Sequence, residues 1–272
     1  MNLATLESTN PALANEEAFG AHLLRDTKAN VASMPGVLAK TAILVAMAMI
    51  AGVGGYEFFG QNPGLLWVGS IVALVVSLGV GFTMYGKPGL APILAPIYAL
   101  VEGAFLGGAT GLIQQMLDNM KVQVPGGVAL QALVITGSVM AGMLVLYRAG
   151  IIKPTNTFVS VISAATLGIM VTYLASFVLS LFGVTLPFVS FGSVTATGTA
   201  GLIGLGVNVL ILVIASLWLV VDFRRIDELL AAGSPKSTEW YCGFCLLVSL
   251  AWIYWEAVKL VARLAVLFGR RD

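Results

Sequence analysis

The sequence predicts an all-α integral membrane protein with seven transmembrane helices. Of its 272 residues, 58% are hydrophobic and only 10% are charged, whereas soluble domains carry about 25% charged residues. The apolar residues gather in long runs, and glycine- and proline-containing breakers separate the runs. No alternating two-residue pattern typical of a membrane β-barrel is present, so the spans are expected to be helical.

Seven apolar runs have the length that a membrane helix needs, about 20 residues for a hydrocarbon layer of about 30 Å. They are Val37–Phe59, Leu65–Tyr85, Leu90–Met116, Gly127–Leu146, Phe158–Phe182, Gly201–Val221 and Trp240–Phe268. Residues 37–272 therefore form the predicted transmembrane domain. Residues 1–36 form a polar N-terminal tail without the apolar segment of a cleavable signal peptide.

Lysine and arginine predict the orientation of these spans. They occur in the tail and in the second-to-third, fourth-to-fifth and sixth-to-seventh turns, while the opposite loops carry only Lys121. Because short cytoplasmic loops are enriched in basic residues, the N-terminus is expected in the cytoplasm. Arg270 and Arg271 argue against seven full spans, which would put them outside, so a last helix that re-enters the membrane stays open.

The composition argues against several classes of function. A net charge of +1 gives no reason to expect a nucleic-acid partner. The single His22 excludes most histidine-dependent catalytic and metal schemes, so we expect no enzyme, no cofactor and no tight metal site. Cys242 and Cys245 have a redox-like spacing, but they lie within an apolar helical run and are interpreted as structural.

Three acidic residues fall within or against the apolar runs, and they are the main candidates for function. They are Glu102 in the third run, Asp222 at the end of the sixth and Glu256 in the seventh. A carboxylate in hydrocarbon costs about 2.5 kcal/mol or more, so such a group pairs, takes up a proton or lines a wet path. Glu102, near mid-membrane, is either a hydrogen-bonded structural residue or part of an ion path.

Two interpretations of Asp222 are open. Arg225 stands at i+3 and could hold Asp222 as a charge at the membrane interface. If the helix instead continues through Leu230, Asp222 lies two turns inside it, which favours a functional role.

Glu256 lies deep in the seventh run, with Lys259 at i+3 and Arg263 at i+7 near the same face. A local Glu256–Lys259 pair is one explanation. A partly wet interior lined by protein is the other, because lysine reaches water only near a helix end. If Asp222 and Glu256 faced each other, one would keep its proton, and the pair would act as a pH switch. Their spacing does not show that they meet, and depth counting places Glu256 deeper.

Small residues stack on one face of the third run, at Gly103, Gly107 and Gly111. Such a face allows two helices to approach closely. It predicts either compact packing within the chain or a homodimer contact; the oligomeric state itself is left open.

The sequence resembles the YccA-like bacterial branch of the transmembrane Bax-inhibitor motif (TMBIM) family. The similarity covers Val37 to Phe268. Its most specific stretches are Pro96–Gly103, Leu146–Lys153, Leu219–Phe223 and the segment from Glu239 to Glu256.

This resemblance implies that the last helix is surrounded by the other six. It also implies a pH-sensitive calcium leak gated by two carboxylates on the sixth and seventh helices. Asp222 matches the sixth-helix acid, Glu256 falls where family members commonly have aspartate, and Glu102 matches an acid of the third helix. Some bacterial relatives are linked to a membrane-bound ATP-dependent protease.

Three functions follow as hypotheses for a multi-pass protein of the bacterial inner membrane. The first is a passive, pH-gated calcium (cation) leak, which needs only weak, transient coordination of the ion. The second is a non-conducting regulator that binds a protease or another partner through its tail. The third is a proton-coupled transporter, against which stands the absence of a clear inverted repeat in the sequence.

Overall fold

A computed structural model describes residues 31–184, 186 and 188–269. Within this part of the chain, seven helices are long and apolar enough to cross a membrane, as the sequence predicts. They are α2 (Met34–Gln61), α3 (Leu66–Gly86), α4 (Ala91–Asn119), α5 (Gly127–Arg148), α6 (Asn156–Leu181), α7 (Gly198–Ala231) and α8 (Thr238–Phe268). The first 30 residues of the predicted tail, and Arg270 and Arg271, lie outside the described residues.

The predicted helix boundaries agree with the structure to within a few residues, with one exception. The sixth span was expected to end at Val221, but α7 continues to Ala231. The added segment contains Arg, Glu and Leu, which favour helix even where they are too polar to read as membrane-spanning. Asp222 therefore lies more than two turns inside the helix.

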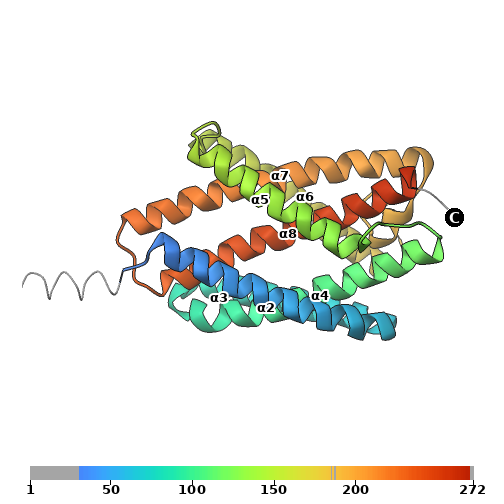
Figure 1. Cartoon of the computed structure of the whole chain (residues 1–272), viewed down its shortest axis with the longest axis horizontal. Helices are drawn as coiled ribbons and strands as arrows, with labels where there is room; N and C mark the ends of the chain where they lie inside the picture. The colour runs from blue at the N-terminus through green and yellow to red at the C-terminus, as the bar shows by residue number, and fades with distance from the viewer. Residues whose placement is uncertain (1–30, 185, 187, 270–272) are drawn as a thin grey trace, which may run out of the picture.

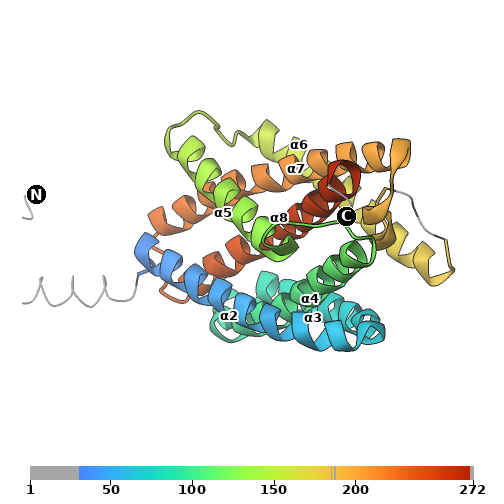
Figure 2. The same cartoon turned by 45° about the vertical axis from the view of Figure 1, so that its right-hand side comes forward.

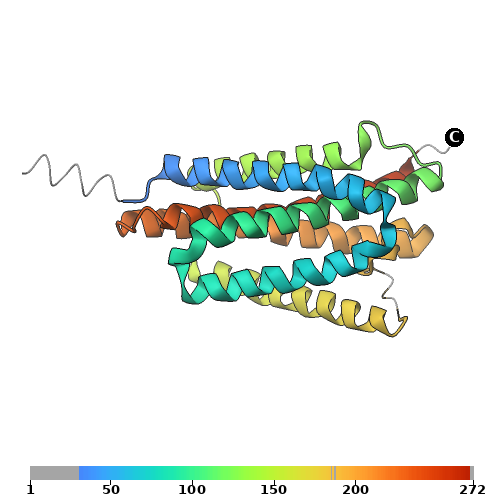
Figure 3. The same cartoon turned by 90° about the horizontal axis from the view of Figure 1, so that it is seen from below.

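Helix α8 runs through the middle of the bundle (Figures 1 and 2). It packs against α7, α2, α5 and α4, and it is the most buried of the seven spans. Helix α3 packs against α4, and α6 packs against α7. Figure 3 shows α3 and α6 together on the face opposite α2 and α5, where Trp67 of α3 stacks on Phe177 of α6. The last helix is thus central, as expected, with four of the other six helices packed along it and α3 and α6 in the outer layer.

The bundle has two ends of different charge. The N-terminal end contains the start of α2 and the α7–α8 turn, which are joined by a hydrogen bond from Ala32 N to Ser234 O of 2.8 Å. Most basic residues of the described loops and helix termini lie at this end: Lys40, Lys87, Arg148, Lys153, Arg224, Arg225 and Lys236. The opposite, C-terminal end has Lys121 in the α4–α5 loop. This asymmetry is the pattern that the positive-inside rule describes.

The glycine stripe of α4 is used for packing within the chain. A Cβ atom at Gly107 would lie 1.9 Å from the carbonyl oxygen of Gly52, and one at Gly103 would lie 2.2 Å from that of Ala48. Both of these contacts are with α2. Only glycine allows the α2 and α4 backbones to approach this closely. Compact packing therefore accounts for the stripe.

A buried acid joins the first span to the last at the N-terminal end. The Glu239 side chain, 1% exposed, accepts hydrogen bonds of 3.1 Å from both the backbone N–H and the hydroxyl of Ser33. Ser33 also caps α2, since its hydroxyl accepts from Gly36 N at 3.2 Å. These bonds fix the start of α8 against the start of α2.

Candidate functional site

Asp222 lies at the interface between α7 and α8, and a neutral side chain is its partner. The hydroxyl of Ser249 in α8 donates a hydrogen bond of 2.5 Å to Asp222 Oδ2. Within the part of the chain that the structure describes, no basic side chain forms an ion pair with Asp222. The negative charge of this carboxylate is therefore stabilised by a hydroxyl dipole, which is a much weaker partner than a cation.

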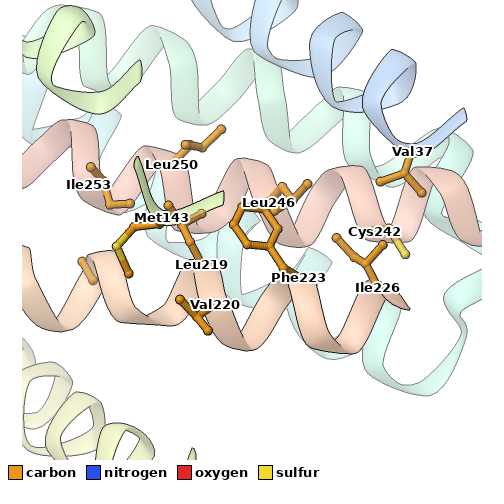
Figure 4. Close-up of a cluster of buried hydrophobic side chains, with 11 residues drawn as sticks. Val37, Met143, Leu219, Val220, Phe223, Ile226, Cys242, Leu246, Leu250 and Ile253 are labelled. Carbon is orange, nitrogen blue, oxygen red and sulfur yellow. The ribbon is translucent and has the colours of Figure 1, made fainter. Parts of the chain in front are cut away.

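Asp222 lies beside a cluster of buried hydrophobic side chains, which Figure 4 shows. Leu219, Val220 and Phe223 flank it along α7, and all three are buried. On α8, Leu246 and Leu250 belong to the same hydrophobic cluster, and Leu250 points away from α7. Asp222 itself is half-buried, and apolar surroundings of this kind disfavour a charge. A change in the protonation of Asp222 is thus expected to alter the packing of α7 against α8.

Arg225, the expected partner of Asp222, points elsewhere. Its side chain is 71% exposed, and its nearest carboxylate is that of Glu228, at 3.7 Å. Arg224 also pairs with Glu228, at 2.7 Å, and donates to the carbonyl oxygen of Pro154. The spacing of i+3 suggested an Asp222–Arg225 pair, but Asp222 bonds to Ser249 of α8, whereas Arg225 is exposed and pairs with Glu228.

Glu256 has a complete set of partners from three helices. Its side chain is fully buried, and Lys259 Nζ lies 2.8 Å from Oε1, which gives the local pair that the sequence suggested. Tyr173 of α6 donates to the same oxygen at 2.6 Å. Asn208 of α7 donates to Oε2 at 2.7 Å and to the Glu256 backbone carbonyl at 3.1 Å. Glu256 is thus neutralised and hydrogen-bonded by the protein itself.

Arg263 lies one turn beyond Lys259 and binds a different segment. Its guanidinium donates to the carbonyl oxygen of Ser193 at 3.0 Å, to the Ser193 hydroxyl at 2.9 Å and to the carbonyl oxygen of Phe188 at 3.2 Å. Gly204 of α7 leaves room for it, since a Cβ there would lie 2.1 Å from Nη1. Arg263 therefore anchors the α6–α7 connection, which includes η3 (Phe191–Thr195), to the central helix.

The structure does not bring Asp222 and Glu256 together. Asp222 faces Ser249, which lies about two helical turns before Glu256 on α8. Glu256 faces Asn208, which lies about 20 Å of helix rise before Asp222 on α7. The two acids expected to form one latch thus occupy two separate polar sites along the same α7–α8 interface. This separation agrees with their positions in the apolar runs, where Glu256 lies farther from the end of its run than Asp222 does.

Glu102 lies at a third site, where it lines a cavity of about 730 Å³ between α2, α4, α5 and α8. Ser77 of α3 donates to Glu102 Oε2 at 2.9 Å. The lining is mainly apolar, and its threonine hydroxyls bond to carbonyls of their own helices, as Thr41 does to Val37 O at 2.9 Å. Helix α8, seen between α2 and α5 in Figure 2, contributes Leu247, Leu250, Ala251 and Tyr254.

Because Leu250 lines the cavity and Ser249 bonds to Asp222, helix α8 separates the two sites. A small rotation or shift of α8 would therefore change both the Asp222 contact and the shape of the cavity.

Sequence reasoning missed four polar residues of these sites: Ser249, Asn208, Tyr173 and, as a buried residue, Glu239. Asn208 gave a usable signal, since it interrupts an apolar run. Ser249 and Tyr173 gave none, because both residue types are common in membrane helices without such a role. Among the described residues, no group of three or more His, Cys, Asp or Glu side chains could hold a metal ion. Cys242 and Cys245 are free thiols.

Comparison with known proteins supports the resemblance found in the sequence. Residues 10–266 match the family model described as Bax inhibitor 1 like. No curated protein and no solved structure matches significantly. The family match covers most of the chain, including α2 to α7 and nearly all of α8. The chain therefore belongs to the Bax inhibitor 1-like family of multi-pass membrane proteins.

Proposed function

We propose that this protein is a pH-sensitive cation leak, with calcium as the transported ion, in the bacterial cytoplasmic membrane. The observation that carries the proposal is the Asp222–Ser249 contact, a carboxylate without a cationic partner at the interface with the central helix. A protonated Asp222 is compatible with close packing in its apolar surroundings. An ionised Asp222 favours a looser, wetter interface. The leak is therefore expected to open as pH rises.

The cavity that contains Glu102 supplies the rest of the proposed path. The cavity is half open and is lined partly by exposed side chains such as Leu38 and Val53. Its lining is apolar and its threonine hydroxyls are already bonded, so it would pass ions only when water fills it. Glu102 is the acid in this lining, and it would attract a cation that enters. Calcium prefers six to eight oxygen ligands, so one carboxylate would bind it weakly, as a leak requires.

We place the N-terminal end of the bundle in the cytoplasm. The concentration of lysine and arginine there supports this orientation. In this arrangement Asp222 lies in the cytoplasmic half of the membrane, and the pH of the cytoplasm sets its protonation. The Glu256 site lies nearer the other side, and we assign it a structural role.

Calcium-dye liposomes test the proposal. Purified protein is reconstituted, and calcium entry is followed from mildly acidic to mildly alkaline pH. The wild-type chain should show flux that increases with pH, and Asp222→Asn should give low flux that no longer depends on pH. Asp227→Asn is the matched control: Asp227 is on the same helix and is bound by Tyr147 at 2.8 Å, but it lies at the helix end. It should retain the wild-type profile.

Absence of flux at every pH would favour the second candidate, a non-conducting regulator of a membrane-bound ATP-dependent protease. The proposed docking element is then the polar tail, of which residues 1–30 lie outside the described residues. A chain lacking these residues would lose the partner in a pull-down but still insert into the membrane. Loss of partner binding together with preserved flux would show that both roles exist.

A further inference from the structure

The ammonium group of Lys259 occupies the position that a bound cation would take. Its Nζ lies 2.8 Å from Glu256 Oε1 and 2.6 Å from the hydroxyl oxygen of Tyr173. The same nitrogen lies 4.7 Å from the ring centroid of Tyr173 and 5.5 Å from that of Trp255. A carboxylate, a hydroxyl and two aromatic rings are the groups with which proteins bind organic cations.

The residues around the Lys259 ammonium, here called the cage, come from separate helices. Tyr173 is on α6, while Trp255, Glu256 and Lys259 are on α8. Asn208 of α7 closes another side by binding Glu256 Oε2 at 2.7 Å. Lys259 is 5% exposed and Glu256 is fully buried, while Tyr173 and Trp255 are half-buried and form the outer side of the site. Arg263, the next cation along α8, bonds to the carbonyl oxygens of Ser193 and Phe188. The cation bonded to Glu256 is therefore Lys259.

We propose that Glu256, Tyr173 and Trp255 form a binding site for a monovalent organic ammonium ion, and that the Lys259 side chain normally fills this site from within the chain. One carboxylate balances one positive charge, so the site fits a monovalent ion better than calcium, which needs more oxygen ligands. The aromatic rings favour an alkylammonium over a strongly hydrated metal ion. The inference is independent of the leak, because its test requires no ion flux.

Replacing lysine by alanine removes three methylene groups and the ammonium, which together correspond to n-propylammonium. The thermal stability of detergent-solubilised Lys259→Ala should therefore increase with n-propylammonium concentration and saturate, with a rise of about 2–4 °C for each 1 kcal/mol of binding. The wild-type chain should not respond, because its own ammonium fills the site. Neutral n-propanol should not stabilise Lys259→Ala, because it lacks the charge.

Two variants control for other effects of the amine. Lys40→Ala also removes a lysine whose ammonium lies over an aromatic ring, that of Trp240 at 5.0 Å, but the cage carboxylate is far from it on another part of α8. It should show no saturable response. The double variant Glu256→Gln, Lys259→Ala lacks the carboxylate and should also show none.

A Lys259→Ala chain that does not respond to n-propylammonium would overturn the proposal. An equal response in the wild-type chain, in Lys40→Ala or in the double variant would also overturn it. If Lys259→Ala aggregates when it is extracted, the extraction is repeated with n-propylammonium. Recovery of a monodisperse protein supports the site, and continued aggregation contradicts it.

Discussion

Two acids of the α7–α8 interface differ sharply in their surroundings. Glu256 is fully buried and has an ammonium, a phenol and an amide as partners. Asp222 has the hydroxyl of Ser249. Both carboxylates lie within membrane-spanning helices of one chain, yet the first is neutralised by the protein and the second is not. Position in the membrane therefore does not by itself make an acid sensitive to pH; the presence of a fixed counter-charge decides.

Under the proposed function, this difference separates a structural element, at Glu256, from a pH-dependent switch, at Asp222. A buried ion pair whose hydrogen bonds are all made resists titration, because removing either charge leaves the other stranded. A half-buried acid with a neutral donor can exchange its proton at a smaller energetic cost, so it can couple pH to packing. The following variants test how far the two sites differ.

The largest effect is expected from Lys259→Met, which keeps an apolar stem but leaves Glu256 without its cation. Breaking a buried pair in this way destabilises a protein by about 3–5 kcal/mol. Thermal or denaturant unfolding of the solubilised protein measures the loss. Adding Glu256→Gln should restore much of the stability, since the stranded charge is then removed as well. If the single variant is as stable as the wild type, the cluster is not the structural element described above.

A smaller effect is expected from Ser249→Ala, which removes the donor that faces Asp222. The loss should be about 1–3 kcal/mol where Asp222 is ionised, because hydrogen bonds to charged groups are the stronger ones. It should be less at low pH, where the carboxyl is protonated. Unfolding measured across pH tests this dependence. Ser216→Ala is a matched control, since Ser216 bonds to the Leu212 carbonyl of its own helix. Equal losses at all pH values would contradict the role given to Asp222.

The smallest effect is expected from Arg225→Gln. This side chain is 71% exposed and lies 3.7 Å from Glu228. Exposed helical pairs contribute about 0.5 kcal/mol or less, so neither stability nor the pH profile of calcium flux should change measurably. A marked shift of that profile would mean that Arg225 acts on Asp222 after all, and the contrast between the two acids would weaken.

The helices could be predicted from the sequence because their signal is local. A run of about 20 apolar residues is sufficient to identify a span, and proline and glycine mark its ends. The end of α7 was left open for the same reason. The segment after Val221 is charged, so a hydrophobicity criterion ends there, although the helix continues to Ala231. The glycine stripe of α4 predicted a close helix contact, but the sequence did not indicate that α2 is the partner.

The candidate sites could be predicted only in part. The Glu256–Lys259 pair follows from a spacing of three residues on one helix. The contacts of Tyr173, Asn208 and Ser249 connect helices far apart in sequence, and one sequence without an alignment does not reveal which faces meet. Ser249, rather than Glu256, faces Asp222 in the structure. The sequence could not predict this, because counting residues from the ends of two apolar runs does not fix which residues of the two helices lie opposite each other.

The central place of α8 has a consequence for how the protein is made. This helix is the last of the seven to leave the ribosome, yet α2, α4, α5 and α7 all pack against it. Until translation reaches Phe268, those four helices have no common partner, and Glu239 is not yet in place to bind Ser33. A nascent chain interrupted before that point would be inserted but not assembled. Its exposed inner faces would mark it for cellular quality control.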